Sequence, residues 1–452
     1  MTQKVDVVVL GLGPGGEEVA GALAEAGLNV VGIEKELVGG ECPYWGCVPS
    51  KMMIRAADLL AEGRRIPGAA GASTVTPDWS PVAHRIRAEA TDNWDDKVAV
   101  DRFTGKGGHF VRGAARITGP GRVEAGGETY EAGRGIVIAT GAVPVIPPIP
   151  GLKDVAFWTN RDAVKADPLP ASMMVLGGGA IGAELAQAFS RFGVRVTVIE
   201  GAPRLLPLEE PEAGEMLAEV FRQQGIDVII GAQATAVRQG RDGIEVEVGG
   251  RTVTAERLLV ATGRRPNTAD LGLELIGIEA KKGIPVDGRL SAGDRVWAIG
   301  DVTGLGAFTH LAMYHAGIVV SAILGKEGHD ADHHALPRVT FTDPEVGSVG
   351  LSEADAREQG IKVRTGSSKG AESARGWSHG PGHEGFIKLI EDTSRGVLVG
   401  ATSAGPWGGE VLSMLCLAVH AATPVKTLRG MIYAYPTFHR GVEDALRDLA
   451  EH

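Results

Sequence analysis

Cysteine is scarce in this sequence, with three in 452 residues. Structural disulfides belong mainly to oxidising compartments, and a disulfide scaffold needs a far higher cysteine content. Two of the three, Cys42 and Cys47, lie together in the stretch GGECPYWGCVPSK of residues 39–51. A structural zinc site usually needs four clustered ligands, and the sequence has no second close pair of cysteines. We therefore interpret the pair as reactive, keep metal binding as the minor alternative, and expect no metal site.

The sequence also lacks an excess of positive charge, a leader pattern and long apolar runs. The 45 lysines and arginines are outnumbered by 56 aspartates and glutamates, which gives a net charge of −11 and leaves no basic run. Such a chain is not expected to bind nucleic acid. The N-terminal sequence MTQKVDVVVLGLG enters an apolar strand at once, without the pattern of a cleavable leader, and no apolar stretch reaches the length of a membrane span. These absences predict a cytoplasmic protein with no membrane partner.

Glycine, in contrast, is abundant: the chain has 66, about twice the usual share. An excess of this kind is typical of tight backbone turns that approach phosphate-bearing ligands. At 452 residues the chain is also too long for one core, and we expect two to four domains.

The first glycine turn follows a β-branched run at residues 5–10. A helical pattern at 19–24, a second strand at 30–33 and the acid Glu34 come after it. Glycines at such a turn let backbone N–H groups and a helix N-terminus approach a pyrophosphate, and the acid accepts a ribose hydroxyl. Because all five parts fall in order, the segment predicts a dinucleotide site rather than an ordinary glycine-rich turn. The turn glycines are Gly11, Gly13 and Gly16.

The same pattern returns after the stiff connector PVIPPIP at 144–150, which we take as the first domain boundary. A strand at 173–176, a glycine turn, a helix at 183–192 and a strand at 194–199 end in Glu200. Two such fingerprints predict two bound dinucleotides. The second set of turn glycines is Gly177, Gly179 and Gly182, and Ala261-Thr262-Gly263 repeats the earlier Ala139-Thr140-Gly141.

Glu200 also bears on which nicotinamide cofactor is used. A carboxylate at this place accepts the 2′-hydroxyl of NADH and repels the 2′-phosphate of NADPH. Arg204 is close enough in sequence to weaken that preference. We therefore expect NADH, with NADPH as the open alternative.

The stretch at 39–51 resembles the redox motif GGxCxxxxCxPSK of the flavin-dependent pyridine-nucleotide disulfide oxidoreductases. Dihydrolipoamide dehydrogenase, glutathione reductase and mercuric reductase belong to this family, and the resemblance covers essentially the whole chain. It implies an α/β fold, in a homodimer, with two Rossmann-like dinucleotide-binding domains and a C-terminal α+β dimerisation domain. The implied boundaries are 1–150 with 266–336 for the FAD domain, 151–265 for the NAD(P) domain and 337–452 for the dimerisation domain.

The resemblance also implies roles for single residues. Electrons would pass from NAD(P)H through FAD to a Cys42–Cys47 disulfide and on to a small disulfide substrate, with Cys47 next to the flavin and Cys42 facing the substrate. Lys51 and Glu184 match the family's buried pair beside the flavin, and an ordinary ion pair is the alternative. The other residues matched to cofactor contacts are Ala115, Thr140, Gly141, Gly263, Asp301 and His310, the last with a core or capping histidine as its alternative.

The C-terminus departs from the family. Disulfide reductases of this group carry His-Pro-Thr-x-x-Glu there, contributed across the dimer, whereas this chain has Tyr435 and Arg440 at the His and Glu positions. A tyrosine, with an ordinary pKa of about 10, is a poor base at neutral pH but can donate a proton. Tyr435 is therefore one candidate for the missing acid, and His439 is a second candidate of lower rank.

Other functions stay open. The thiols could be secondary, with electrons delivered to a quinone or another small acceptor, or the protein could sense NADH with little turnover. Tyr44 and Trp45, between the cysteines, either shape a pocket for an aromatic substrate or pack against the flavin domain. Residues 77–100 are expected to form one helix in which Trp94 is a packing residue, and residues 123–130 are expected to form a strand.

Overall fold

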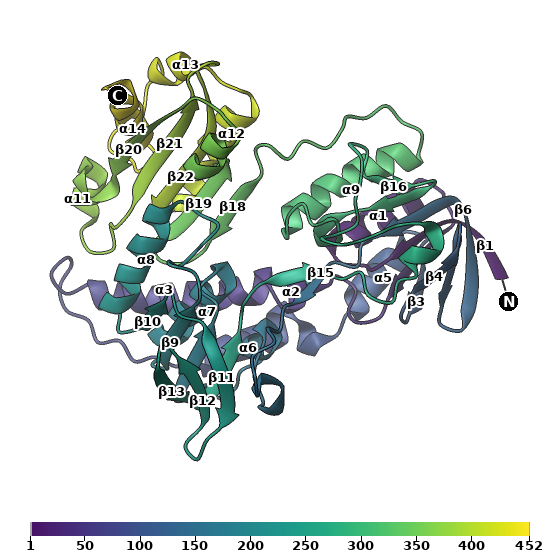
Figure 1. Ribbon diagram of the computed structural model, residues 1–452, viewed down its shortest axis with the longest axis horizontal. Helices are drawn as coiled ribbons and strands as arrows, with labels where there is room; N and C mark the ends of the chain where they lie inside the picture. Colours follow the sequence, from purple (N-terminus) through teal and green to yellow (C-terminus); the bar gives the residue numbers. More distant parts are fainter. Residues whose placement is uncertain (1, 452) are drawn as a thin grey trace. The chain divides into compact units, whose positions relative to one another are not determined.

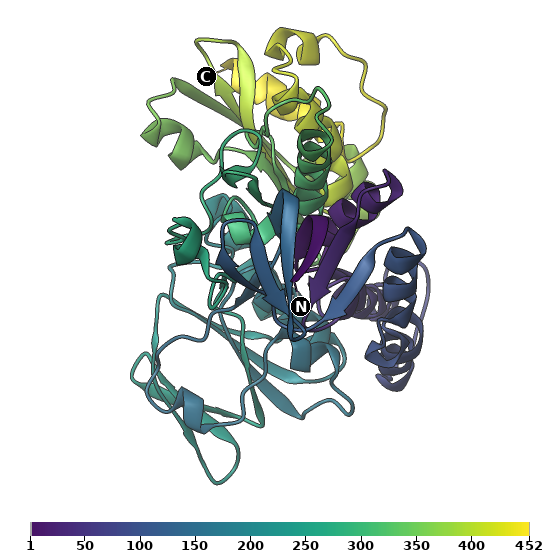
Figure 2. The same cartoon turned by 90° about the vertical axis from the view of Figure 1, so that its right-hand side faces the viewer.

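The computed structural model describes residues 2–451, which form two compact units (Figures 1 and 2). The first unit consists of residues 2–49, 83–145 and 263–333, and the second of residues 50–82, 146–262 and 334–451. None of the helices within these described residues combines the length and the apolar character needed to cross a membrane.

The core of the first unit is a mostly parallel sheet with the strand order β16-β17-β6-β1-β2-β3. Strand β1 pairs in parallel with β2 and β6, and its residues 7–10 are fully buried. Such burial on both faces explains why this strand is a continuous β-branched run instead of an alternating one. The strands of this unit are β1 Thr2–Leu10, β2 Val30–Glu34, β3 His109–Arg112, β4 Arg116–Gly119, β5 Arg122–Ala125, β6 Glu128–Ile138, β7 Ala142–Pro144, β15 Arg264–Pro266, β16 Ser291–Gly293 and β17 Val296–Ala298.

Helix α1 follows β1 and packs closely on α9 in the same unit. The contact requires a glycine, because a Cβ at Gly15 would lie 2.8 Å from the carbonyl oxygen of Ala312 on α9. Helix α3 begins in the first unit, at Cys47, and continues into the second, and helix α4 begins in the second unit, at Ser80, and ends in the first. The helices are α1 Pro14–Glu25, α2 Glu41–Tyr44, α3 Cys47–Arg65, α4 Ser80–Arg85, α5 Lys97–Gly105 and α9 Thr309–Ile323.

The second unit repeats the strand, turn, helix and strand pattern in a parallel sheet of order β10-β9-β8-β14, beside an antiparallel sheet of order β11-β12-β13. The strands are β8 Ser172–Leu176, β9 Arg195–Glu200, β10 Asp227–Ile230, β11 Ala234–Gln239, β12 Ile244–Val248, β13 Arg251–Ala255 and β14 Arg257–Val260. The helices are α6 Asn160–Val164, α7 Ala180–Arg191 and α8 Pro211–Gln223.

The C-terminal part of the second unit is an antiparallel sheet of order β18-β19-β22-β21-β20 (Figure 1). Helices α12 and α14 pack on this sheet in one hydrophobic cluster. The strands are β18 Pro337–Thr340, β19 Glu345–Gly350, β20 Val363–Lys369, β21 Phe386–Asp392 and β22 Val397–Gly405. The helices are α10 Glu353–Glu358, α11 Ala374–His379, α12 Gly408–His420, α13 Val425–Arg429 and α14 Gly441–Glu451.

The prediction of one helix over residues 77–100 is wrong. Helix α4 ends in a π-helical turn at Ile86–Ala90, and a new helix, α5, begins only at Lys97. The hydroxyl of the buried Thr91 donates to the carbonyl oxygens of Ile86 and Arg87. In a regular helix, backbone N–H groups donate to these oxygens, so the side chain competes with the helical hydrogen bonds. The helix therefore breaks at Thr91.

The prediction of one strand over residues 123–130 is also wrong. Gly126 and Gly127 have φ values of +60° and +79° and form the turn of a hairpin between β5 and β6. Two successive residues with positive φ are the requirement of a tight hairpin turn, and glycine meets it without steric cost.

Candidate active site

The two glycine turns have the same internal contact. In the turn after β1, Gly11 has a φ of +89°, and a Cβ at Gly16 would lie 2.1 Å from the Gly11 carbonyl oxygen. In the turn after β8, Gly177 has a φ of +105°, and a Cβ at Gly182 would lie 2.0 Å from the Gly177 carbonyl oxygen. Any side chain at the third glycine of either turn would collide with backbone, so both turns require glycine there.

The middle glycine of each turn faces open space. Gly13 is the N-cap of α1 and Gly179 is the N-cap of α7. No atom lies within 4 Å of the place where a Cβ would stand on either residue. The first N–H groups of a helix have no partner within the helix and carry a partial positive charge, so each cap can hold a pyrophosphate. Both sites therefore fit a dinucleotide.

The acid at the end of each second strand is fixed by two backbone N–H groups. Glu34 accepts from Leu12 at 2.9 Å and from Glu36 at 2.8 Å. Glu200 accepts from Gly178 at 2.6 Å and from Ala202 at 2.7 Å. Burial raises the pKa of Glu34, and the two backbone hydrogen bonds oppose that rise. The repetition of this geometry supports the prediction of two similar nucleotide sites.

Arg204 donates to backbone carbonyl groups in the loop that follows Glu200. One of its terminal nitrogens lies 3.1 Å from the Pro207 oxygen and 3.4 Å from the Glu209 oxygen. The guanidinium group is thus used to stabilise its own loop.

The other residues matched to cofactor contacts lie in the first unit, some of them next to the paired strands β7 and β15. The Thr140 hydroxyl donates to the backbone carbonyl oxygen of Asn267 at 2.7 Å, and the backbone N–H of Asn267 donates to the Gly141 carbonyl oxygen at 2.9 Å. Asp301 lies in a 3-10 helix, where burial raises the pKa of its carboxyl group and the nearby Arg264 lowers it. The remaining two lie on loops: Ala115 packs against the hydrophobic cluster of the sheet, and Gly263 has a φ of +118°.

Each of the two redox cysteines lies at the N-terminal end of a helix, Cys42 in the short α2 and Cys47 in the long α3. Cys42 is the second residue of α2 and is partly buried, whereas Cys47 is the first residue of α3 and is exposed. The Cys47 sulfur lies 3.4 Å from the hydroxyl oxygen of Thr309, the first residue of α9. The sequence did not single out Thr309 as a partner of the thiol, because 262 residues separate the two.

Lys51 lies on α3 one turn beyond Cys47, and its ammonium group is 2.9 Å from a carboxylate oxygen of Glu184. The other carboxylate oxygen of Glu184 accepts the backbone N–H of Phe341 at 2.8 Å. The Lys51 ammonium group also lies 4.5 Å from the centre of the Phe341 ring. The predicted ion pair is therefore present, and Phe341 is a third member that sequence analysis missed.

A second cluster of polar contacts continues along α7. Gln187 donates to the carbonyl oxygen of Asp343 at 2.7 Å and accepts its backbone N–H at 2.8 Å. The buried Arg191 pairs with the carboxylates of Asp343 and Asp58, and Arg65 pairs with Asp343 as well. Together these contacts hold α3, α7 and the turn after β18 to one another.

At the C-terminus Tyr435 is exposed, with 69% of its surface accessible. The guanidinium group of Arg440 lies 5.3 Å from the centre of the Tyr435 ring and also pairs with Glu443 and Asp444. The ring of His439 instead lies 6.4 Å from the ring of Tyr433. The structure therefore joins Tyr435 to Arg440, the two residues that depart from the family pattern.

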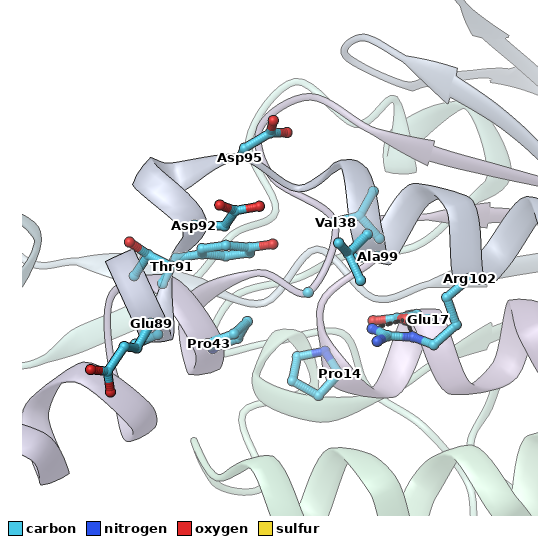
Figure 3. A pocket seen from close by; sticks show the side chains of 14 residues that line it. Pro14, Glu17, Val38, Pro43, Glu89, Thr91, Asp92, Asp95, Ala99 and Arg102 are labelled. Atoms are coloured by element: carbon cyan, nitrogen blue, oxygen red, sulfur yellow. Dashed lines mark hydrogen bonds and ion pairs between the residues drawn. The ribbon is translucent and has the colours of Figure 1, made fainter. Parts of the chain in front are cut away.

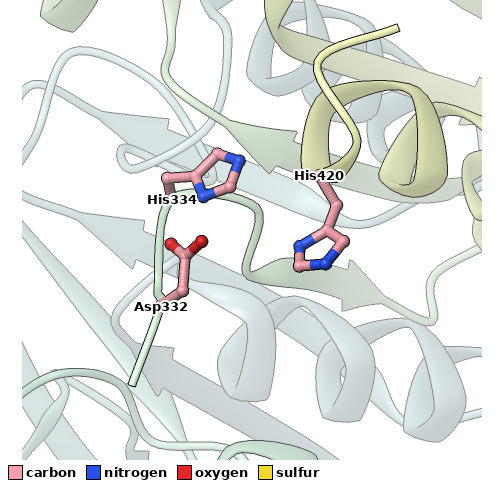
Figure 4. A group of neighbouring side chains, drawn as sticks. All are labelled: Asp332, His334 and His420. Carbon is pink, nitrogen blue, oxygen red and sulfur yellow. The ribbon is translucent and has the colours of Figure 1, made fainter. Parts of the chain in front are cut away.

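The surroundings of His310, and of the pair His334 and His420, could not be predicted from the sequence. His310 is exposed, and its ring stacks on Phe308 at 5.1 Å. The core alternative for His310 is therefore wrong, and the capping alternative and a flavin contact both stay predictions. In the second unit the rings of His334 and His420 stack at 5.7 Å (Figure 4), a pair that no sequence pattern indicated.

Comparisons with known proteins agree with this geometry. The family model described as pyridine nucleotide-disulphide oxidoreductase matches residues 5–316, and the model of that family's dimerisation domain matches residues 336–446. A dihydrolipoyl dehydrogenase of Chlorobaculum tepidum is 33% identical over 468 residues, which cover 100% of this chain and 98% of the relative. A mercuric reductase of Acidithiobacillus ferrooxidans is 33% identical over 455 residues, which cover 98% of this chain and 82% of the relative.

Among solved structures, the HOCl-induced flavoprotein disulfide reductase RclA of Escherichia coli is similar to this chain. The TM-score is 0.85 at 27% sequence identity, and the match covers 98% of this chain and 99% of that one.

The polar cluster on α7 predicts a pH dependence of stability. Burial raises the pKa of Asp58 to about 6, which is above the value of about 4 in an unfolded chain. The protonated carboxyl group therefore stabilises the folded state fully below about pH 4, and this contribution is lost as the pH rises through about 6. Relative to Asp58→Asn, the wild-type protein should lose stability over that interval, as measured by urea unfolding at a series of pH values. Parallel pH profiles for the two proteins would contradict the prediction.

Proposed function

Because the chain belongs to the pyridine nucleotide-disulphide oxidoreductase family, we propose that it uses NADH to reduce a small disulfide through Cys42 and Cys47. Membership confirms the α/β fold class, the enzyme class and the two cofactors, FAD and NAD(P)H, that were predicted from the sequence. The protein is thus a flavin-dependent disulfide oxidoreductase, and the proposal concerns its substrate, its electron donor and its residues.

The proposal depends above all on the position of Cys47. Its sulfur lies at the start of α3 and 3.4 Å from the hydroxyl of Thr309 at the start of α9. The N-terminus of a helix favours a thiolate over a thiol, and the Thr309 hydroxyl is able to donate to a thiolate at this distance. FAD, when bound, accepts a hydride from the nicotinamide and supplies two electrons to a disulfide. The family resemblance assigns Cys47 as the thiol next to the flavin, and a thiolate at the start of α3 suits that role.

The two thiols would then act in sequence. The Cys42 thiolate attacks one sulfur of the substrate disulfide, so that a mixed disulfide forms and one substrate thiol leaves. Cys47 attacks Cys42 in the mixed disulfide, releases the second substrate thiol and restores the Cys42–Cys47 bond. Two electrons and two protons are consumed for each substrate disulfide, and NADH provides the electrons.

Lys51 provides a fixed positive charge near this site. Glu184 holds the ammonium group at 2.9 Å, and the Phe341 backbone N–H holds Glu184 in turn. Because both oxygens of the carboxylate are engaged, Glu184 acts as a positioning group for Lys51. The cation would favour negative charge on a neighbouring cofactor ring.

Tyr435 is proposed as the proton donor to the departing substrate thiol, reaching the site of a second subunit in a homodimer. Neither a phenol nor the guanidinium group of Arg440 is a good proton acceptor at neutral pH. A Tyr–Arg pair at this place therefore suits disulfide reduction, in which protons are donated, better than thiol oxidation, in which they must be accepted. The match of the dimerisation-domain model to residues 336–446 supports the homodimer.

NADH is proposed as the donor because a carboxylate at the end of the second strand of such a unit accepts a 2′-hydroxyl and repels a 2′-phosphate, and Glu200 ends β9. The guanidinium group of Arg204, which could weaken this preference, donates to the Pro207 carbonyl oxygen. We also propose the three-domain division described from the sequence, with the FAD domain at 1–150 and 266–336, the NAD(P) domain at 151–265 and the dimerisation domain at 337–452.

Replacing Cys47 with serine tests the electron path. The Cys47→Ser protein should lose disulfide turnover, because serine cannot form a disulfide, and should keep reduction of its FAD by NADH. Anaerobic titration with NADH, followed in the visible spectrum, gives both results. In the wild-type protein the titration should produce the long-wavelength absorbance of a thiolate beside oxidised flavin. If Cys47→Ser still reduces the best acceptor from a panel of disulfides and quinones, the quinone reductase alternative holds instead.

Replacing Tyr435 with phenylalanine tests the proton donor. The Tyr435→Phe protein should turn over disulfides about a hundredfold more slowly, because loss of a general acid typically costs that much or more. The rate of FAD reduction by NADH should not change. The matched control is His439→Ala, which should have nearly wild-type turnover. A large loss in His439→Ala with none in Tyr435→Phe would assign the role to His439.

Removing Arg204 tests the choice of cofactor. Because its guanidinium group donates to Pro207 and Glu209, the Arg204→Ala protein should keep the wild-type ratio of kcat/KM for NADH over NADPH. Steady-state kinetics with both nucleotides measure the ratio. A rise of several-fold in the KM for NADPH alone would mean that Arg204 reaches the 2′-phosphate.

A further inference from the structure

The segment between α4 and α5 has an irregular backbone that ends on Trp94. A π-helical turn at Ile86–Ala90 is followed by Asp92, Asn93 and Trp94 with φ values of 46°, 57° and 59°. Consecutive non-glycine residues in the left-handed region are costly and persist only where surrounding contacts hold them. Both π-helical turns and such outliers occur often at functional sites.

Trp94 contacts two of the four residues that separate the redox cysteines. Its ring stacks on the ring of Trp45, with centres 5.8 Å apart and planes inclined by 19°. Its indole N–H donates to the carbonyl oxygen of Tyr44 at 3.3 Å. Tyr44 and Trp45 are themselves buried, with 6% and 9% of their surfaces accessible. Trp94 thus contacts the segment between Cys42 and Cys47 in two ways: its ring stacks on Trp45, and its indole N–H donates to the backbone carbonyl of Tyr44.

The turn that carries Trp94 is fixed on both sides of the tryptophan. Before it, the buried Thr91 donates its hydroxyl to the end of the preceding helix. After it, the buried Asp96 accepts the backbone N–H of Val38 at 2.7 Å and pairs with Arg112. Figure 3 shows Asp92 and Asp95 of the turn on one side of a cavity of about 430 Å³ that Pro43 of the redox segment also lines. Hydrogen bonds of two buried residues therefore hold the turn on both sides of Trp94.

We propose that Trp94 is a positioning residue that holds Cys42 and Cys47 in the relative position needed for disulfide formation. The inference rests on the proposed function, since it matters only if the two sulfurs alternate between disulfide and dithiol. Reduction adds two electrons and two protons and breaks the S–S bond, after which the segment of residues 42–47 could relax. A support that prevents relaxation keeps each thiol near the other, favours the disulfide and so lowers the reduction potential of the pair.

The experiment measures the reduction potential of the Cys42–Cys47 pair in the FAD-loaded protein, by anaerobic equilibration with dithiothreitol redox buffers. Trp94→Ala should shift the equilibrium toward the dithiol at least tenfold, which is about 30 mV for a two-electron couple. Trp94→Phe keeps a stacking ring but has no donor for Tyr44, so an intermediate shift is expected. The matched control is Asn93→Gly, which changes the same turn without touching the ring contact and should keep the wild-type potential, since glycine tolerates the φ of 57°.

The readouts separate this inference from the function on which it rests. If the wild-type protein shows no thiolate absorbance and no redox-active pair, the proposed function fails. If the wild-type pair is active and Trp94→Ala, folded and loaded with FAD, has the wild-type potential, the positioning role of Trp94 is overturned. Thermal unfolding and FAD content identify a variant that has lost its fold, and Trp94→Phe then decides: a wild-type potential in that variant overturns the proposal as well.

Discussion

A carboxylate that leaves water must find compensating charge and hydrogen bonds, and Glu184 finds both in Lys51 and the backbone of Phe341. Lys51 belongs to α3, Glu184 to α7 and Phe341 to the turn after β18, so one buried charge fixes parts of the chain that are far apart in sequence. Gln187 and Arg191 continue the same arrangement along α7. The result is a cation presented at a defined place, one turn beyond Cys47 on the same helix.

The sequence predicted those parts of the site whose constraints are local. Gly11 and Gly16 stand five residues apart, and the collision that forbids a side chain at Gly16 lies inside their own turn. Pattern and spacing are therefore enough to find such a turn, and the same holds for the second copy at Gly177. The acid at the end of each second strand could be found for the same reason, because its distance from the glycines is set by one strand, turn and helix unit.

Contacts between distant segments could not be predicted in this way. Thr309, Phe341 and Trp94 contact Cys47, Lys51 and Tyr44, respectively, and no spacing in the sequence links them to these residues. The two wrong local predictions have a different cause, because the features that decided them are local in sequence. Thr91 breaks a helix through a side-chain hydrogen bond that hydrophobic periodicity does not register, whereas the Gly126-Gly127 turn was a hairpin signal within the predicted strand.

The way in which Glu200 is bound has a consequence for attempts to change the nucleotide preference. Its two oxygens accept the backbone N–H groups of Gly178, in the turn after β8, and of Ala202, directly after β9. Exchange of this acid for a cationic or small residue would leave both N–H groups without their acceptor and would destabilise the glycine turn after β8. The carboxylate that is proposed to set the nucleotide preference therefore also stabilises the backbone around it, and an engineered switch would have to redesign residues 200–204 together.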